Sequence, residues 1–203
     1  MNNTIIFSNE CTSGRYYKVN KLQYNNPIIW HHWPINNYIE FIKNFDNVNL
    51  SNYEILPIDG DTYFKNMYNF EKNSKLTYYV KIDNKYKIAY SHYIFNKTEK
   101  ISGDNKYSPN IKEYVVQKYE TRLKRYNSEQ NKQIVFLFGE KKYTSIEDEL
   151  KFINVITPYK KFLYTSHKEL LKYKNDNMVI IYNDHINHDK VNIDFSKELN
   201  KYL

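Results

Sequence analysis

The chain has 203 residues, of which 41% are hydrophobic, four are glycine and five are proline. This length and composition predict one folded domain over residues 1–203 and exclude a disordered or linker-rich protein. The net charge of +7 favours anionic partners, but only three of the 30 basic residues are arginine, so we expect a scattered lysine coat and no specific nucleic-acid binding.

The single cysteine, Cys11, excludes an internal disulfide and a cysteine-based zinc site within one chain. No basic segment precedes the first apolar stretch, which is too short for a secretory signal. No run approaches the roughly 18 apolar residues that span a bilayer. We therefore expect a cytoplasmic protein with no transmembrane segment.

The first part of the chain predicts a strand, two helices and an extended segment. Residues 4–7 are an apolar run typical of a buried strand, and the turn-forming residues 8–10 end it. A helix is expected to open around residues 15–17. Apolar side chains spaced for one helical face predict a second helix over residues 35–45, and residues 53–57 are expected to be extended.

The rest of the chain alternates strands with helices. The predicted elements are a hairpin of residues 76–82 and 86–95 with its turn at 83–85, helices over 111–127, 146–153 and 168–172, and strands over 134–138, 159–164 and 178–182. The run 134–138 is apolar without interruption, which is typical of a central strand. This alternation predicts an α/β fold, in which a mixed sheet is flanked by helices.

Cys11 lies between the first predicted strand and the first predicted helix. Backbone amides at a helix N-terminus favour a thiolate over a thiol, so this position suits a nucleophile. The alternative is a small residue packed beside the strand, because free cysteine is among the most buried residue types. The segment by itself is compatible with both roles.

Several short motifs follow one another along the chain. They are Ser8-Asn9-Glu10-Cys11 with Gly14, Leu22-Gln23-Tyr24-Asn25-Asn26-Pro27, the Pro-initiated helix of residues 34–42, Ser91-His92-Tyr93, the aromatic-Glu-x-Arg-x-x-Arg segment of residues 119–125, and Pro158-Tyr159-Lys160-Lys161-Phe162 with Thr165. Over roughly residues 4–185, this ordered set resembles a bacterial family described as exopolysaccharide biosynthesis proteins of unknown function. The resemblance implies a role in building capsule or another surface glycan, on a glycan or activated-sugar substrate. It supplies no mechanism.

The order of Cys11 and His92 is similar to that of papain-like thiol enzymes, in which the cysteine opens a helix and the histidine lies on a following strand. That similarity implies that His92 takes the thiol proton and that the thiolate attacks an acyl carbon. Glu140, just after the predicted strand 134–138, or Asn96 would orient the imidazole. The alternative for His92 is a histidine hydrogen-bonded inside a sheet.

Arg122 and Arg125 are two of the three arginines and lie on successive turns of a predicted helix. Such a pair can clamp a phosphate or a carboxylate of the substrate, or it can bond to Glu120 and neighbouring acids in a structural role. Residues 30–33 depart from the family, whose members tend to be plainly apolar there. The further residues that we therefore expect to contact the ligand are Trp30, His31 and Trp33.

These observations predict a thiol-dependent acyl transferase or hydrolase of surface-glycan biosynthesis, which acts on a partly anionic substrate without a metal or other cofactor. A second candidate is a glycosyltransferase, because Asp59-Gly60-Asp61 has the Asp-x-Asp form that holds a divalent cation against a nucleotide sugar. Turns favour the same residues, so the motif also fits a simple turn. The third candidate is a non-catalytic component of glycan assembly, in which Cys11 is merely packed.

Overall fold

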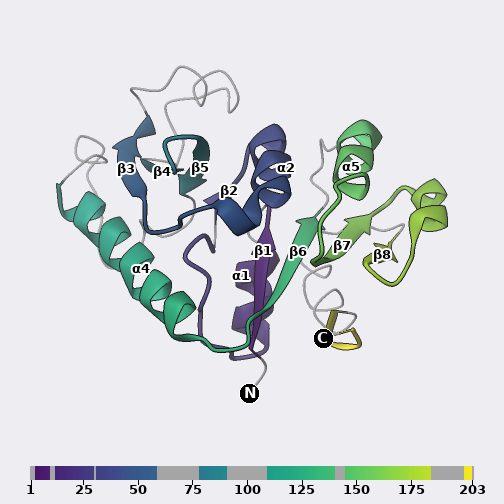
Figure 1. Cartoon of the computed structure of the whole chain (residues 1–203), viewed down its shortest axis with the longest axis horizontal. Coiled ribbons are helices and arrows are strands. Elements are labelled where there is room, and N and C mark those ends of the chain that lie inside the picture. Colours follow the sequence, from purple (N-terminus) through teal and green to yellow (C-terminus); the bar gives the residue numbers. More distant parts are fainter. Residues whose placement is uncertain are drawn as a thin grey trace.

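The computed structural model describes residues 3–9, 12–29, 31–58, 78–90, 109–139, 145–183 and 199–202. In this part of the chain the strands form two sheets, one parallel and one antiparallel, and helices pack against them (Figure 1). The predicted α/β class is confirmed. The described strands are divided between these two sheets, whereas the sequence predicts a mixed sheet.

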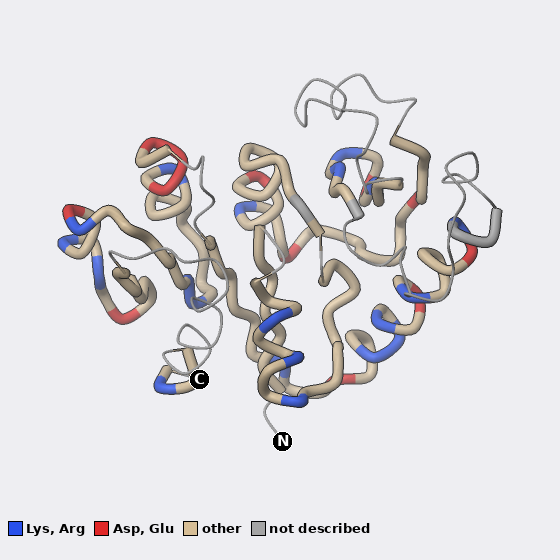
Figure 2. Tube along the Cα trace, turned by 180° about the vertical axis from the view of Figure 1, so that it is seen from behind, with Lys and Arg blue, Asp and Glu red and all other residues tan. Residues whose placement is uncertain are grey.

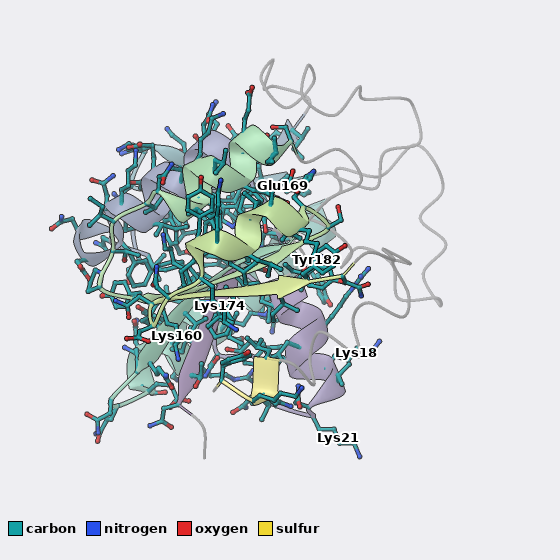
Figure 3. The ribbon with its side chains drawn as sticks, turned by 90° about the vertical axis from the view of Figure 1, so that its right-hand side faces the viewer. Lys18, Lys21, Lys160, Glu169, Lys174 and Tyr182 are labelled. Carbon is teal, nitrogen blue, oxygen red and sulfur yellow. The ribbon has the colours of Figure 1, made fainter. Side chains whose placement is uncertain are left out.

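The parallel sheet has the strand order β1-β6-β7-β8. Its strands are β1 (Thr4–Ser8), β6 (Gln133–Gly139), β7 (Lys160–Thr165) and β8 (Met178–Tyr182). β6 is central, as its uninterrupted apolar sequence predicts. β8 is the last strand in the order, and Figure 3 shows Lys160 and Lys174 near its amino end. Charged side chains at such an edge hinder pairing with a strand of another chain.

The antiparallel sheet has the strand order β2-β5-β4-β3. Its strands are β2 (His31–His32), β3 (Tyr53–Pro57), β4 (Tyr78–Ile82) and β5 (Tyr86–Tyr90). The predicted hairpin turn joins β4 to β5, and Asp83 and Asn84 adopt the left-handed φ values of 49° and 54° that a tight hairpin turn requires. β2 was not predicted, because two residues carry no periodic pattern and their pairing depends on β5.

Several helical segments lie wholly within the described residues. They are α1 (Thr12–Val19), α2 (Ile35–Lys43), α4 (Pro109–Ser128), α5 (Ile146–Ile153) and the 3-10 helices η1 (Phe45–Asn47) and η3 (Lys168–Tyr173). α5 has the predicted bounds, and Ser145 Oγ accepts a hydrogen bond from the Asp148 amide at 3.2 Å, which caps the first turn. α1 begins at Thr12, earlier than the predicted opening around residues 15–17.

The parallel sheet is buried on both faces, because alternate residues of each strand point to opposite sides. On one face, Ile6, Val135 and Leu137 belong to a cluster with Tyr16 and Tyr17 of α1. The opposite face carries Ile5, Phe7, Ile134, Phe136 and Phe138. These side chains share a second cluster with apolar residues of α2, α4, α5 and the antiparallel sheet. The two sheets therefore meet in one apolar core.

Lys161 of β7 closes the carboxyl end of α5. Its side chain is only 5% exposed, and Nζ donates to the carbonyls of Phe152, Ile153 and Val155 at 3.0, 2.6 and 2.6 Å. The last carbonyls of a helix have no partner within the helix, and a cation there also complements the helix dipole. Burial of the ammonium lowers the pKa of Lys161 from 10.5 to about 8.

Charged residues are distributed over several elements. Figure 2 shows basic residues along α1 and α4 and in other described segments, with acidic residues between them. This is the scattered distribution that the sequence predicts. Among the helices of the described ranges, none has the length and apolar character needed to cross a bilayer.

Candidate active site at the carboxyl edge of the parallel sheet

The carboxyl ends of β1, β6 and β7 lie side by side at one edge of the parallel sheet. Ligands of open α/β sheets bind at this edge, where the loops after the strands meet. Cys11 follows β1 and Glu140 follows β6, and both lie outside the described residues.

Two serines close the turn between β1 and α1. The Ser13 amide donates to Ser8 Oγ at 3.1 Å, and the Ser8 hydroxyl donates to Ser13 Oγ at 2.8 Å. Both side chains are buried. Ser8 thus satisfies an amide of the first turn of α1, and the helix begins at Thr12, directly after Cys11. The predicted strand-to-helix junction is confirmed.

Asn9 ties the end of β1 to the end of β6. The Gly139 amide donates to Asn9 Oδ1 at 2.9 Å, and Asn9 Nδ2 donates to the Gly139 carbonyl at 3.2 Å. Gly139 also lies against the start of α1, since a Cβ at this position would be 2.9 Å from Thr12 Oγ1. The segments that precede Glu140 and flank Cys11 are therefore held against each other.

The predicted base, His92, lies outside the described residues, two positions beyond the end of β5. Tyr90, the last residue of β5, is paired with His31 of β2. The chain after β2 returns to β1, because the Trp33 amide donates to the Asn9 carbonyl at 3.0 Å. This route brings β5 towards β1 through β2, while contact between Cys11 and His92 stays a prediction.

A carboxylate–imidazole pair that was not predicted from the sequence lies beside the carboxyl end of β7. Glu149 of α5 is fully buried, and its Oε2 accepts a hydrogen bond from Thr165 Oγ1 at 2.8 Å and lies 2.9 Å from His167 Nδ1. The His167 amide donates to Thr165 Oγ1 at 2.9 Å. The side chain of His167 is 30% exposed. The signal in the sequence was a Thr-x-His segment at the end of an apolar strand.

Arg122 and Arg125 hold the connector between α1 and β2. Arg122 is buried, its Nη1 donates to the Ile29 carbonyl at 3.3 Å, and its guanidinium carbon lies 5.7 Å from the centroid of the Tyr24 ring. Arg125 Nη1 donates to the Tyr24 carbonyl at 3.2 Å. These backbone contacts give both arginines a structural role. Their binding of a substrate anion stays a prediction.

Trp33 and His31 are both buried. Trp33 is 2% exposed and packs on Tyr38 and Phe41, with ring centroids 5.5 and 4.7 Å apart. His31 has no exposed surface, and its Nδ1 lies 2.7 Å from the Ile29 carbonyl oxygen. Burial leaves little of either side chain for a ligand, so we do not include them in the site. Trp30, the third predicted contact, lies outside the described residues.

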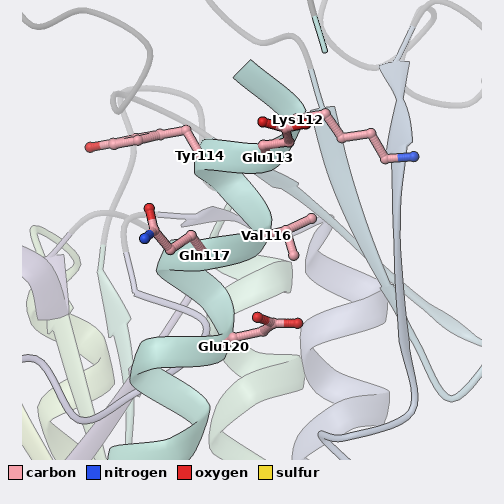
Figure 4. A pocket seen from close by; sticks show the side chains of 6 residues that line it. All are labelled: Lys112, Glu113, Tyr114, Val116, Gln117 and Glu120. Carbon is pink, nitrogen blue, oxygen red and sulfur yellow. The ribbon is translucent and has the colours of Figure 1, made fainter. Parts of the chain in front are cut away.

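A hollow of about 600 Å³ follows the surface of α4. Its lining residues are Lys112, Glu113, Tyr114, Val116, Gln117 and Glu120. Figure 4 shows Tyr114 and Gln117 on one side of the helix and Lys112, Val116 and Glu120 on another. α4 lies beside the antiparallel sheet, away from α5 and β7 (Figure 1). This hollow is therefore separate from the carboxyl edge of the parallel sheet.

The second candidate function depends on Asp59-Gly60-Asp61, which lies outside the described residues. Within the described ranges, no group of three or more histidine, cysteine or acidic residues is placed to hold a metal ion. No protein-family model matches this sequence, and no curated protein matches it either. The resemblance to exopolysaccharide biosynthesis proteins therefore stays a prediction, and function is argued from the geometry of the carboxyl edge.

Proposed function

We propose that this protein is a thiol-dependent acyl transferase or hydrolase with Cys11 as its nucleophile. The observation that carries the proposal is the junction between β1 and α1. Ser8 caps the amide of Ser13, and the helix starts at Thr12, the residue that follows Cys11 in the sequence. A thiol at such a position would lie near helix N-terminal amides. Their partial positive charge favours a thiolate.

The chain after β5 and the chain after β6 would supply the remaining groups of the reaction. His92 is the base predicted from the sequence, and Glu140 is its orienting carboxylate. The hydrogen bonds between Asn9 and Gly139 support this arrangement, because they hold the segments next to Cys11 and Glu140 together. The thiolate would attack the carbonyl carbon of an ester, amide or thioester, and water or an acceptor hydroxyl would then release the acyl group.

The substrate class comes from the motifs and the charge. The motif resemblance supports a glycan, or an activated precursor of one, in the synthesis of a surface polysaccharide. The net charge of +7 supports an anionic portion on that substrate. We place the reaction in the cytoplasm and assign it no metal or other cofactor.

The test uses the single cysteine of the chain, because one added mass reports on one thiol. The protein is incubated with iodoacetamide at pH 7, and intact-mass spectrometry follows the labelling rate. We expect Cys11 to react at least about ten times faster than glutathione, since the thiolate is the reacting form. A C11S variant gives the blank. If the native protein is labelled slowly and the labelling rate in urea rises to that of glutathione, the result would contradict the proposal and indicate a packed thiol.

The glycosyltransferase remains the second candidate, because Asp59 and Asp61 have the spacing of a cation-binding motif. Thermal unfolding is measured with nucleotide sugars in the presence of Mn²⁺. A bound ligand raises the midpoint by mass action, and the rise should vanish in D59N/D61N. If no ligand raises the midpoint and Cys11 is unreactive, the non-catalytic role in glycan assembly is favoured.

A further inference from the structure

We propose that the outer face of α1 binds the surface of an anionic phospholipid bilayer. This face consists of Arg15, Lys18 and Val19 of the helix and of Lys21 and Leu22 in the turn that follows it, and we call it the α1 patch. The two lysines are exposed and the arginine is partly exposed. Binding of a bilayer goes beyond the proposed function and does not depend on it.

The α1 segment is basic, in contrast to the other α-helices. Residues 12–23 include three basic residues and no acidic one, whereas α2, α4 and α5 each carry both kinds. In Figure 2, α1 accordingly shows blue segments without red ones. One acid from another part of the chain, Glu129, acts on this helix, since its charge helps to raise the pKa of Tyr17. A surface with this excess of positive charge is attracted to the negative surface of an anionic bilayer.

Exposed apolar side chains lie among these charges. Val19 is 45% exposed and Leu22 is 38% exposed. Arg15, Lys18 and Val19 share one face of α1, because residues three and four positions apart are neighbours on a helix. A phosphate backbone offers no apolar surface to cover such side chains, whereas a bilayer buries them between its head groups and acyl chains. The combination of basic and apolar residues therefore favours a bilayer over a nucleic acid.

The turn after α1 holds Lys21 in a conformation that usually belongs to glycine. The Leu22 amide donates to the Tyr17 carbonyl at 2.9 Å, and the Lys21 amide donates to the Lys18 carbonyl at 3.3 Å, which is the pattern of a Schellman cap. Lys21 occupies the left-handed position of this cap, with a φ of 53°. Glycine adopts this conformation without steric cost, and a lysine does not. The chain therefore carries a charge at a position where stability alone would favour glycine.

The α1 patch lies at the end of the parallel sheet opposite the candidate active site. The Tyr17 hydroxyl donates to the Thr4 carbonyl at 3.1 Å, so the last turn of α1 is fixed beside the start of β1. In Figure 1, this end of α1 lies towards the N-terminus of the chain. Figure 3 shows Lys18 and Lys21 extending outward from α1. A bilayer bound to this patch would leave the carboxyl edge of the sheet open to solution.

The experiment measures how much of the full chain sediments at pH 7 with phosphatidylcholine vesicles, either pure or containing about 30% phosphatidylglycerol. We expect binding to the anionic vesicles only, and weaker binding in about 0.5 M salt, which screens the charges. K18Q/K21Q should lower the partition coefficient at least about tenfold, because each lysine at an anionic surface contributes a factor of about five. The matched control K43Q/K151Q removes two exposed charges from α2 and α5 and should stay within about twofold of the wild type.

Two further variants separate the apolar contribution and the fold from the charge. V19S/L22S keeps every charge and should lower the partition coefficient several-fold, because the apolar side chains no longer enter the bilayer. K21G should be at least as stable as the wild type, since glycine suits the left-handed position, and should still bind the vesicles less tightly. Circular dichroism and the thermal midpoint show whether each variant is folded.

Several outcomes would overturn the inference. A wild type that does not sediment with anionic vesicles, or that sediments equally with pure phosphatidylcholine, excludes an anionic bilayer as the partner. An equal loss of binding in K43Q/K151Q would mean that only the net charge matters. If V19S/L22S binds vesicles as the wild type does and heparin or DNA competes with them, the α1 patch binds polyanions in general. If K18Q/K21Q does not fold, K21G takes its place, and unchanged binding in K21G overturns the inference.

Discussion

Lys161→Met tests whether a buried ammonium holds the end of α5. Methionine keeps most of the side-chain volume and removes the donors to Phe152, Ile153 and Val155. Phe152 O retains the Val155 amide as a donor at 3.2 Å, so its loss is small. Val155 O loses a buried contact, and Ile153 O loses a partly buried one that water can replace. A buried acceptor without a donor costs about 1–3 kcal/mol and a replaced hydrogen bond about 1 kcal/mol.

The expected decrease in the free energy of unfolding at pH 7 is therefore about 2–4 kcal/mol, measured by urea denaturation. The difference in the free energy of unfolding between the wild type and Lys161→Met should also depend on pH. The pKa of Lys161 is about 8 in the folded protein, against 10.5 when unfolded. Between these values the unfolded state binds more protons, so wild-type stability rises with pH relative to the variant, by up to about 3 kcal/mol. Other titrating groups are common to both proteins and cancel.

Two results would refute this reasoning. A variant as stable as the wild type at pH 7 would mean that the cost of burying the ammonium equals the value of its three hydrogen bonds. A stability difference that stays constant from pH 7 to 10.5 would mean that the helix carbonyls compensate the desolvation and that the pKa of Lys161 is not lowered. Lys151→Met, on the exposed side of α5, is the matched control and should change stability far less than Lys161→Met does.

The remaining predictions concern the carboxyl edge and the buried tyrosines. Gly139→Ala should lower the free energy of unfolding, measured by urea denaturation, by about 1–3 kcal/mol, because its Cβ would lie 2.9 Å from Thr12 Oγ1. Adding Thr12→Ala should recover most of this loss. A double variant in which the two losses simply add would contradict the contact. Tyr38→Phe should cost about 1–2 kcal/mol, since the hydroxyl lies 2.9 Å from two buried carbonyl oxygens of β1 and β6, and an unchanged urea midpoint would contradict this. Burial raises the pKa of Tyr17 and of Tyr119, so the stability that these hydroxyls contribute below pH 10 should be lost as the pH rises above 10. Absorbance at 295 nm should show their phenolates forming only as the protein unfolds. Ionisation of these tyrosines in the folded protein would contradict the prediction.

Local sequence patterns were enough to predict most strands and helices of the described residues. β8 and α5 have the predicted bounds, because an apolar strand run and a capped amphipathic helix are each specified within a few residues. The junction before Cys11 was predicted in the same way, from an apolar run followed by turn-forming residues. At this junction the start of α1 differed from the prediction, since its capping group, Ser8, lies on the preceding strand.

The candidate site was less accessible from sequence, because its groups meet only through the order of the strands. Glu149 was an ordinary helix-start acid and His167 an unremarked residue, until β7 placed one against the other at 2.9 Å. The same holds for Arg122, whose acceptor at residue 29 lies 93 positions away. Composition and periodicity thus determined the α/β class and its elements, through interactions within single segments. The tertiary structure decided which polar groups are buried and paired, because hydrogen-bond partners are set by how the sheets and helices pack.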